Sequence, residues 1–135
     1  MNSLEKQDYW LGLRINGERY ALAASQVHSV FLYPEQEQSI KELKISGVVV
    51  HDGEPVYLRN HFQLLKSGRG IENSAPWRQV LKREHAPWIV VLRDGGERGL
   101  GFRVNNIVGP FHSPVVPHTP FLHYNGLDFY LVEVI

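Results

Sequence analysis

The chain of 135 residues contains no cysteine and a single methionine. Without cysteine there can be no disulfide, no thiolate nucleophile and no cysteine-ligated metal centre. At about one domain's length, the chain can bury a self-sufficient apolar core without covalent cross-links. The lack of cysteine is typical of a reducing compartment, and we therefore expect a cytoplasmic protein.

The sequence also lacks long apolar runs and an excess of charge of either sign. No stretch approaches the roughly 20 apolar residues that span a bilayer, and residues 1–10 have no apolar core of the kind that a signal peptide carries. We therefore expect no insertion into a membrane. The 14 basic and 14 acidic side chains cancel, so no nucleic-acid partner is expected. A protein near its isoelectric point is less protected from self-association, which favours work within an assembly.

What the sequence does have is a strong hairpin pattern over residues 88–109. Trp88 to Leu92 is a run of five apolar residues rich in β-branched types, which predicts a buried strand. Asp94-Gly95-Gly96 predicts a chain reversal, because glycine adopts positive φ without steric cost. Apolar residues then alternate with Gly101 and Arg103, which predicts a strand with one buried face. The residues expected in the core are Val90, Leu92, Leu100, Phe102 and Val104.

Three further turns divide the rest of the chain into strands. Asn16-Gly17, Asp52-Gly53 and Asn125-Gly126 are typical of type I′ hairpin turns, whose two central residues need positive φ. Strands are predicted at residues 9–15, 19–23, 27–32, 45–51, 55–58 and 129–134. Pro55 lacks a donor N–H, which favours an edge position for its strand. For the same reason, a central strand is not expected in the segment that contains Pro110, Pro114, Pro117 and Pro120.

Helical signals are few and short. Asn60 is a candidate cap for a helix over residues 61–66. Ser74 predicts the start of a second helix, because a proline follows in its first turn, and Pro87 predicts its end. On that helix one face would carry Trp77, Val80 and Leu81. Short strands with few helices indicate an all-β barrel class.

The seven histidines are the main source of candidate catalytic or metal-binding groups. His112, His118 and His123 lie close together in sequence, and three histidines can hold zinc with an open position for water. Their spacing matches no familiar zinc motif, and no Gly-x-Ser-x-Gly nucleophile elbow is present. For His51 and His61, a structural or surface role is expected. We therefore expect no metal, no cofactor and no enzymatic activity. The alternative is a small β-barrel protein that binds a metal or ligand through the late histidines.

Several segments resemble, in the same order, those of the CheW-like domain family, the coupling module of bacterial chemotaxis. Residues 19–22 with 24–27 resemble the family's first hairpin, and residues 47–62 resemble its central hairpin. Residues 88–109 resemble the hairpin of its second barrel, and residues 131–134 its late strand. The resemblance covers residues 9–135.

The resemblance implies an all-β fold of two small SH3-like five-stranded β-barrels packed together around a shared core, with one or two short helices. Residues 1–135 would form a single domain. Its halves 9–66 and 87–135 would form the two barrels, joined by a linker and helix at 67–86. The resemblance also implies a non-enzymatic adaptor or scaffold that couples chemoreceptors to a histidine kinase. Its partners would be the regulatory domain of the kinase and the cytoplasmic tip of the receptor.

The chain departs from the family pattern at three places. Where the family often has Arg-Gly at the central turn, this chain has Asp52-Gly53, which reverses a charge involved in partner contacts. Asp52 and Gly53 are therefore the predicted partner-binding residues. Asn105 stands where the family usually has aspartate. The family also usually has a helix after its last strand, whereas we expect none in this chain. A strand edge left uncovered in this way would favour a weak homodimer.

Overall fold

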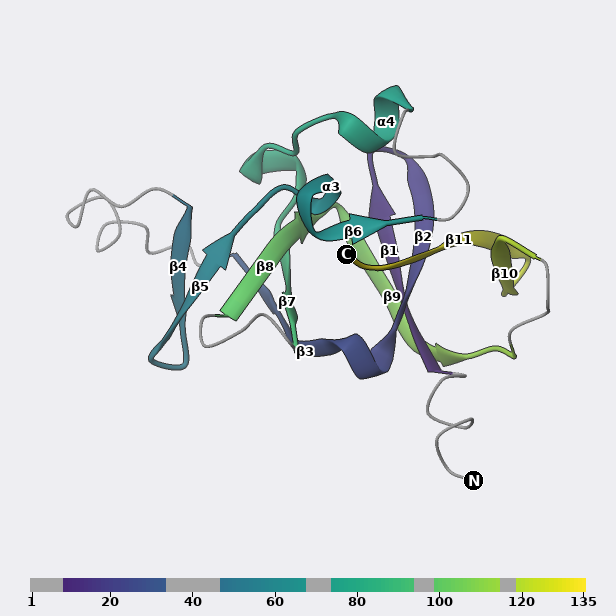
Figure 1. Cartoon of the computed structure of the whole chain (residues 1–135), viewed down its shortest axis with the longest axis horizontal. Helices are drawn as coiled ribbons and strands as arrows, with labels where there is room; N and C mark the ends of the chain where they lie inside the picture. Colours follow the sequence, from purple (N-terminus) through teal and green to yellow (C-terminus); the bar gives the residue numbers. More distant parts are fainter. Residues whose placement is uncertain (1–8, 34–46, 68–73, 94–98, 115–118) are drawn as a thin grey trace.

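The computed structural model describes residues 9–33, 47–67, 74–93, 99–114 and 119–135 (Figure 1). Its strands are β1 (Tyr9–Ile15), β2 (Glu18–Ala23), β3 (Val27–Leu32), β4 (Val48–His51), β5 (Glu54–Leu58), β6 (Leu65–Lys66), β7 (Trp88–Leu92), β8 (Gly99–Val104), β9 (Asn106–His112), β10 (Phe121–Tyr124) and β11 (Leu127–Val134). The helical elements are α3 (His61–Leu64), α4 (Ala75–Arg78) and the 3₁₀ turns η1 (Ala24–Gln26) and η3 (Arg83–His85). The all-β class with two short helices is confirmed.

The strands form two sheets. The larger sheet has the order β10-β11-β2-β1-β9, with β6 paired to β11, and the smaller has the order β3-β7-β8-β5-β4. The resemblance predicts five strands in each barrel. The larger sheet has six, because Leu65 and Lys66 pair with Val134 and Glu133. No helix in the described part of the chain is long and apolar enough to cross a bilayer.

Each sheet combines strands from both predicted halves, so the division into barrels at residues 9–66 and 87–135 is wrong. The hairpins themselves are local, but two parallel pairings join distant strands. Tyr130 of β11 lies opposite Tyr20 of β2, and Val56 of β5 lies opposite Gly99 of β8. Along the chain, η1 connects β2 of the larger sheet to β3 of the smaller sheet. The bend at Asn105 connects β8 of the smaller sheet to β9 of the larger sheet.

The turns and the predicted second-barrel hairpin are largely confirmed. Positive φ occurs at the first residue of all three turns, Asn16, Asp52 and Asn125, and at the glycine that follows each. Strands β7 and β8 pair antiparallel, with Val90 opposite Phe102. The predicted reversal at residues 94–96 lies outside the described residues.

The buried apolar side chains form three clusters, one between the two sheets and one belonging to each sheet. The largest lies between the two sheets and contains residues from both, including Leu13, Leu22, Val90, Phe102 and Val132. A second cluster, around Phe111 and Phe129, lies within the larger sheet's fold, and a third, around Phe31 and Val49, within that of the smaller. The expectation of a shared apolar core is therefore confirmed.

The β7–β8 hairpin is buried more completely than its alternating pattern predicts. Val90, Leu92, Phe102 and Val104 are buried as predicted, whereas Leu100 is only half-buried. The opposite face is also covered, because Ile89 and Val91 belong to the third cluster. A side chain at Gly101 would lie 3.0 Å from Val56, so this glycine permits the close approach of β5.

The helices and prolines show smaller departures from the sequence predictions. The first helix ends at Leu64, because Leu65 enters β6. The second ends at Arg78 rather than near Pro87, which leaves Val80 exposed while Trp77 and Leu81 are buried. Pro55 belongs to an interior strand and not an edge strand. It is accommodated because pairing with β8 begins one residue later, at Val56. Strand β9, which contains Pro110, is an edge strand.

Candidate partner-binding surface

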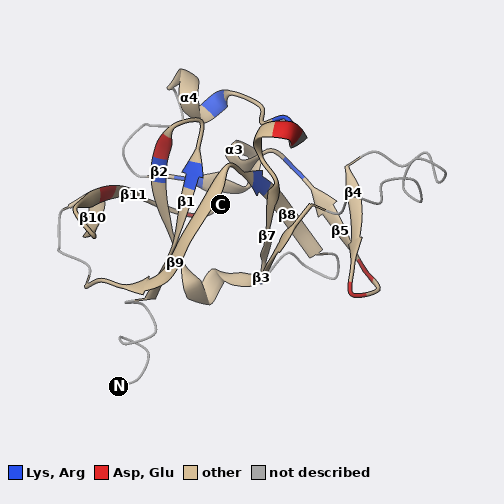
Figure 2. Cartoon of the chain, turned by 180° about the vertical axis from the view of Figure 1, so that it is seen from behind, with Lys and Arg blue, Asp and Glu red and all other residues tan. Residues whose placement is uncertain are grey.

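The β4–β5 hairpin ends in the Asp52-Gly53 turn at the periphery of the smaller sheet (Figure 1). The φ angles of 52° at Asp52 and 78° at Gly53 are the left-handed values that this tight turn requires. The Asp52 side chain is 87% exposed, and its Oδ2 lies 3.4 Å from Nε2 of His51. Glu54 lies opposite His51 in the strand register, and Figure 2 shows acidic residues at the tip. The predicted partner-binding residues thus occupy an exposed, acidic tip.

Strand β4 is one edge of the smaller sheet and β3 is the other. A stacked pair of rings joins these edges: Phe31 of β3 and His51 of β4 have centroids 3.8 Å apart and planes inclined by 4°. Beside this stack in the sequence, Leu32 is 57% exposed and Val50 is 52% exposed. The stack therefore holds two edge strands together while their neighbouring apolar side chains remain in solvent.

These neighbouring features form one candidate site, which we term the hairpin surface: Leu32, Val50, His51, Asp52 and Gly53. Within the described residues, β4 pairs with β5 alone, so β4 is an edge strand of the described sheet. A free strand edge can accept an extended segment of another chain through backbone hydrogen bonds. The hairpin surface thus combines a strand edge, exposed apolar side chains and an acidic turn.

The late histidines are not brought together as a metal site among the described residues. His112 packs edge-on against Tyr9, with ring centroids 5.2 Å apart. His123 forms an ion pair through Nδ1 with Asp128. His118 lies outside the described residues, and the described part of the chain holds no group of three potential metal ligands from histidine, cysteine and carboxylates. The structure gives His112 and His123 separate partners.

His61 lies in the interior, at the start of α3, and is only 2% exposed. Its Nε2–H donates to the carbonyl oxygen of Trp77 at 2.5 Å, and its ring meets the Trp77 ring edge-on with centroids 4.8 Å apart. Burial lowers the pKa of His61, against the smaller opposing effect of that hydrogen bond. The Tyr20 ring also meets the Trp77 ring edge-on, and burial raises the pKa of Tyr20 to about 12, with smaller contributions from Glu18 and Tyr130. The sequence prediction of a structural role for His61 fits these contacts.

The sequence marks Asn105 only as a departure from a family pattern. In the structure, its side chain forms hydrogen bonds that link two distant segments of the chain. Its Oδ1 accepts from the backbone N–H of Asn16 at 2.6 Å, and its Nδ2 donates to the carbonyl of His85 at 2.5 Å. The Asn16 side chain in turn donates to the carbonyls of Pro76 and Gln79 at 2.9 and 3.0 Å. We term residues 74–86 the strap. Two asparagines therefore tie the strap to the β1–β2 turn and to the β8–β9 bend.

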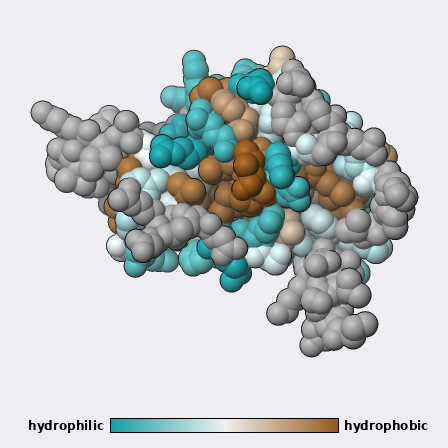
Figure 3. All heavy atoms as spheres, in the orientation of Figure 1, coloured by the Kyte–Doolittle hydropathy of each residue, from teal (hydrophilic) through white to brown (hydrophobic). Residues whose placement is uncertain are grey.

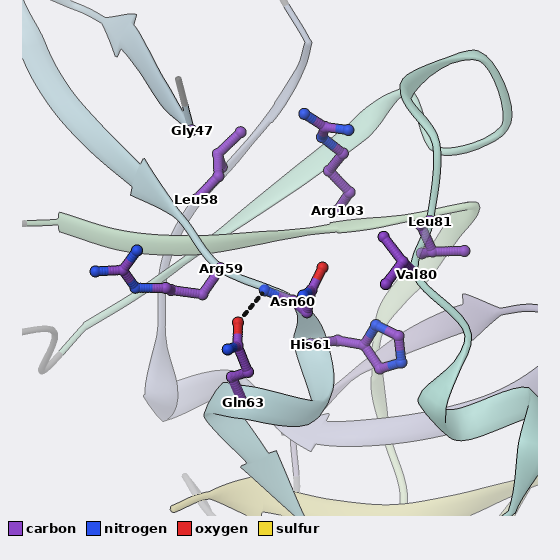
Figure 4. A pocket seen from close by; sticks show the side chains of 9 residues that line it. All are labelled: Gly47, Leu58, Arg59, Asn60, His61, Gln63, Val80, Leu81 and Arg103. Carbon is purple, nitrogen blue, oxygen red and sulfur yellow. Dashed lines mark hydrogen bonds between the residues drawn. The ribbon is translucent and has the colours of Figure 1, made fainter. Parts of the chain in front are cut away.

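A pocket of about 280 Å³ lies between the β5–α3 connection, strand β8 and the strap (Figure 4). Its lining consists of Gly47, Leu58, Arg59, Asn60, His61, Gln63, Val80, Leu81 and Arg103. Sequence reasoning missed this site, because its residues come from four separate segments and match no motif. The lining includes two arginines and no acidic residue.

Apolar side chains also reach the surface on the face shown in Figure 3, around the centre of the view, with hydrophilic residues beside them. Ile135 is 68% exposed, and its backbone N–H donates to the carbonyl of Leu64 at 2.9 Å. Val80, 57% exposed, belongs to the pocket lining. Unlike the hairpin surface, Ile135 is held by the paired end of the larger sheet, where β6 meets β11.

Comparison with known proteins adds no relative to these observations. No protein-family model matches the chain, and no curated protein matches its sequence. The function is therefore inferred from the chemistry of the hairpin surface and from the fold that presents it.

Proposed function

We propose that this chain is a non-enzymatic adaptor that binds partner proteins through the hairpin surface. In keeping with the sequence resemblance, its partners are the regulatory domain of a histidine kinase and the cytoplasmic tip of a chemoreceptor, in the cytoplasm. The observation that carries this proposal is the edge position of β4 among the described strands, with exposed Val50 beside the Asp52-Gly53 turn. Such an edge supplies backbone hydrogen bonds, and the side chains around it supply specificity.

The charge of the tip determines which partner fits. Asp52 and Glu54 are exposed, and residues 47–58 contain no lysine or arginine. A complementary partner therefore carries basic side chains opposite the turn. Charges at the rim of an interface affect partner choice and association rate more than they affect folding stability.

The test measures binding of the full chain to immobilised kinase regulatory domain and receptor-tip fragments by biolayer interferometry. Val50→Glu places a charge on the apolar part of the hairpin surface, and we expect affinity to fall by about tenfold or more. Leu127→Glu is the matched control, since Leu127 is also exposed but lies on the larger sheet. Its affinity should stay within about twofold of the unmodified chain. Failure of both fragments to bind, or equal losses in the two variants, would contradict the proposal.

Asp52→Arg tests the role of charge separately. It restores the residue type that the family often has at this turn, so binding to a conventional chemotaxis kinase should strengthen. The melting temperature should stay nearly unchanged, because Asp52 is 87% exposed. Unchanged affinity for the kinase would show that this turn does not select the partner.

A further inference from the structure

The pocket beside α3 is held open by backbone contacts of its own walls. The Leu58 N–H donates to the carbonyl of Gly47 at 2.6 Å, and the Arg59 N–H donates to the carbonyl of Gly101 at 2.9 Å. At the start of α3, the Asn60 N–H donates to Oε1 of Gln63 at 3.0 Å. These bonds fix the chain around the pocket before any ligand arrives. A volume of about 280 Å³ is at the small end of ligand sites and suits a molecule of few heavy atoms.

Arg103 makes the pocket attractive to an anion. Its guanidinium lies over the ring of Tyr33, with Cζ 5.0 Å from the ring centroid, and Figure 4 shows it at one end of the pocket. No ion pair joins Arg103 to an acidic residue in the described part of the chain. Arg59 adds a second positive charge at the rim. A half-buried guanidinium with no carboxylate partner among the described residues is well suited to bind a carboxylate through two parallel hydrogen bonds.

Part of the pocket wall is apolar. Figure 4 shows Val80 and Leu81 side by side on the strap. In this view, Asn60 and His61 lie between these two residues and Leu58. Val80 is 57% exposed, although it is a large apolar residue next to a pocket. A short branched hydrocarbon chain seated there would remove this surface from water, which is favourable by about 25 cal/mol per Å². The Asn60 side chain belongs to the capping box of α3, which fixes a polar side chain in the pocket lining.

We propose that this pocket binds a small aliphatic carboxylate, with the carboxylate on Arg103 and the branched chain against Val80 and Leu81. The site lies on the strap side of the smaller sheet and shares no residue with the hairpin surface. The proposal therefore does not depend on adaptor function, and either can fail without the other. The chain would then bind a small aliphatic carboxylate in addition to any protein partner.

The test is a titration of the purified full chain by ¹H–¹⁵N NMR, with 3-methylbutanoate as the probe and 3-methylbutanamide as its uncharged counterpart. Saturable shifts are expected for the backbone amides of Asn60, Val80 and Arg103 and for the Arg103 side-chain Nε–H. The amide should bind about tenfold more weakly or not at all, because it carries no charge. Equal binding of the two probes, or no saturable shift at these positions, would overturn the proposal.

Two variants and a control place the ligand. Arg103→Gln should weaken 3-methylbutanoate by about tenfold, whereas Arg14→Gln, at an exposed arginine of β1, should change affinity by less than about twofold. Val80→Ser, at an exposed position that should not affect folding, should weaken 3-methylbutanoate more than it weakens acetate. Unchanged affinity in Val80→Ser, or tighter binding of a glutamate-containing peptide than of the free acid, would refute the small-molecule assignment.

Discussion

Trp77 shows how single residues organise the interior of this protein. Its side chain is fully buried, with edge-on contacts to Tyr20 at 4.9 Å and to His61 at 4.8 Å between ring centroids. Its carbonyl receives the hydrogen bond from His61, while its own Nε1–H is buried and has no hydrogen-bond partner in the described part of the chain. Aromatic packing therefore outweighs the cost of an unsatisfied donor at this position. Through Trp77, the strap is anchored in the core between the two sheets.

His61 predicts a specific pH dependence of stability. Burial lowers its pKa in the folded state, whereas in the unfolded chain the pKa is about 6.5. As the pH falls below about 6.5, the unfolded chain takes up this proton first, so the free energy of unfolding decreases. Urea denaturation at pH 7.5 and 5.5 should therefore show a larger loss for the unmodified chain than for His61→Gln, by up to about 1 kcal/mol. His123→Gln, at an exposed histidine, is the control, and an equal loss in both variants would contradict this assignment.

Phe102 predicts the strength of the central core. Its side chain is fully buried in the cluster shared by the two sheets. Phe102→Ala should lower the free energy of unfolding by about 3–5 kcal/mol, because it removes apolar contacts and leaves a cavity. Leu127→Ala, at an exposed position of β11, should cost less than about 1 kcal/mol. Chemical denaturation of the two variants provides the comparison, and a similarly small cost at Phe102 would show that the shared core is not where stability resides.

At the scale of elements, Asn105 explains how the strap is kept in place, and it predicts a sharp difference between two similar substitutions. Asn105→Asp retains an oxygen for the Asn16 N–H but loses the donor to the carbonyl of His85, so stability should fall by about 1–2 kcal/mol. Asn106→Asp is the matched control, because the Asn106 side chain only accepts a hydrogen bond, from the Ile107 N–H. Thermal and urea unfolding should separate the two variants. Equal stabilities would show that the Asn105 donor contributes nothing.

The hairpins of this fold could be predicted from the sequence because their signals are local. Asn16-Gly17, Asp52-Gly53 and Asn125-Gly126 each specify a turn within four residues, and the apolar run after Trp88 specifies a strand. The way in which the strands are shared between sheets could not be predicted in this way. It depends on the parallel pairings of β2 with β11 and of β5 with β8, which join residues far apart in the chain and leave no local pattern.

The two candidate sites also differ in how far the sequence could predict them. The exposed tip at Asp52 could be predicted, because a single turn creates it. The pocket could not, because Arg103 looks like an ordinary polar position on an alternating strand. Only the fold brings it beside Asn60 and Val80. The strap illustrates the same limit: its helical pattern continues past Arg78, but tertiary hydrogen bonds from Asn16 hold the carbonyl of Gln79 instead.

At the scale of the whole molecule, the two sheets form one cooperative unit. The apolar cluster between them contains side chains from strands β1 and β2 of the larger sheet and from strands β7 and β8 of the smaller sheet. Each sheet also needs strands from both predicted halves, 9–66 and 87–135, to complete its order. Neither half of the sequence can therefore build a complete sheet.

The free edge of β4 predicts weak self-association of the whole protein when no partner is present. With no net charge to oppose association, the edges of two copies can pair through their backbones, with Val50 of each buried in the contact. Sedimentation velocity should therefore show a sedimentation coefficient that rises with concentration. Val50→Glu should remove this rise, because the pairing would bring two like charges together, whereas Leu127→Glu on the larger sheet should leave it unchanged. A partner that occupies the same edge should also dissolve the dimer. A sedimentation coefficient that stays monomeric across the whole concentration range would show that the edge of β4 does not recruit a second copy.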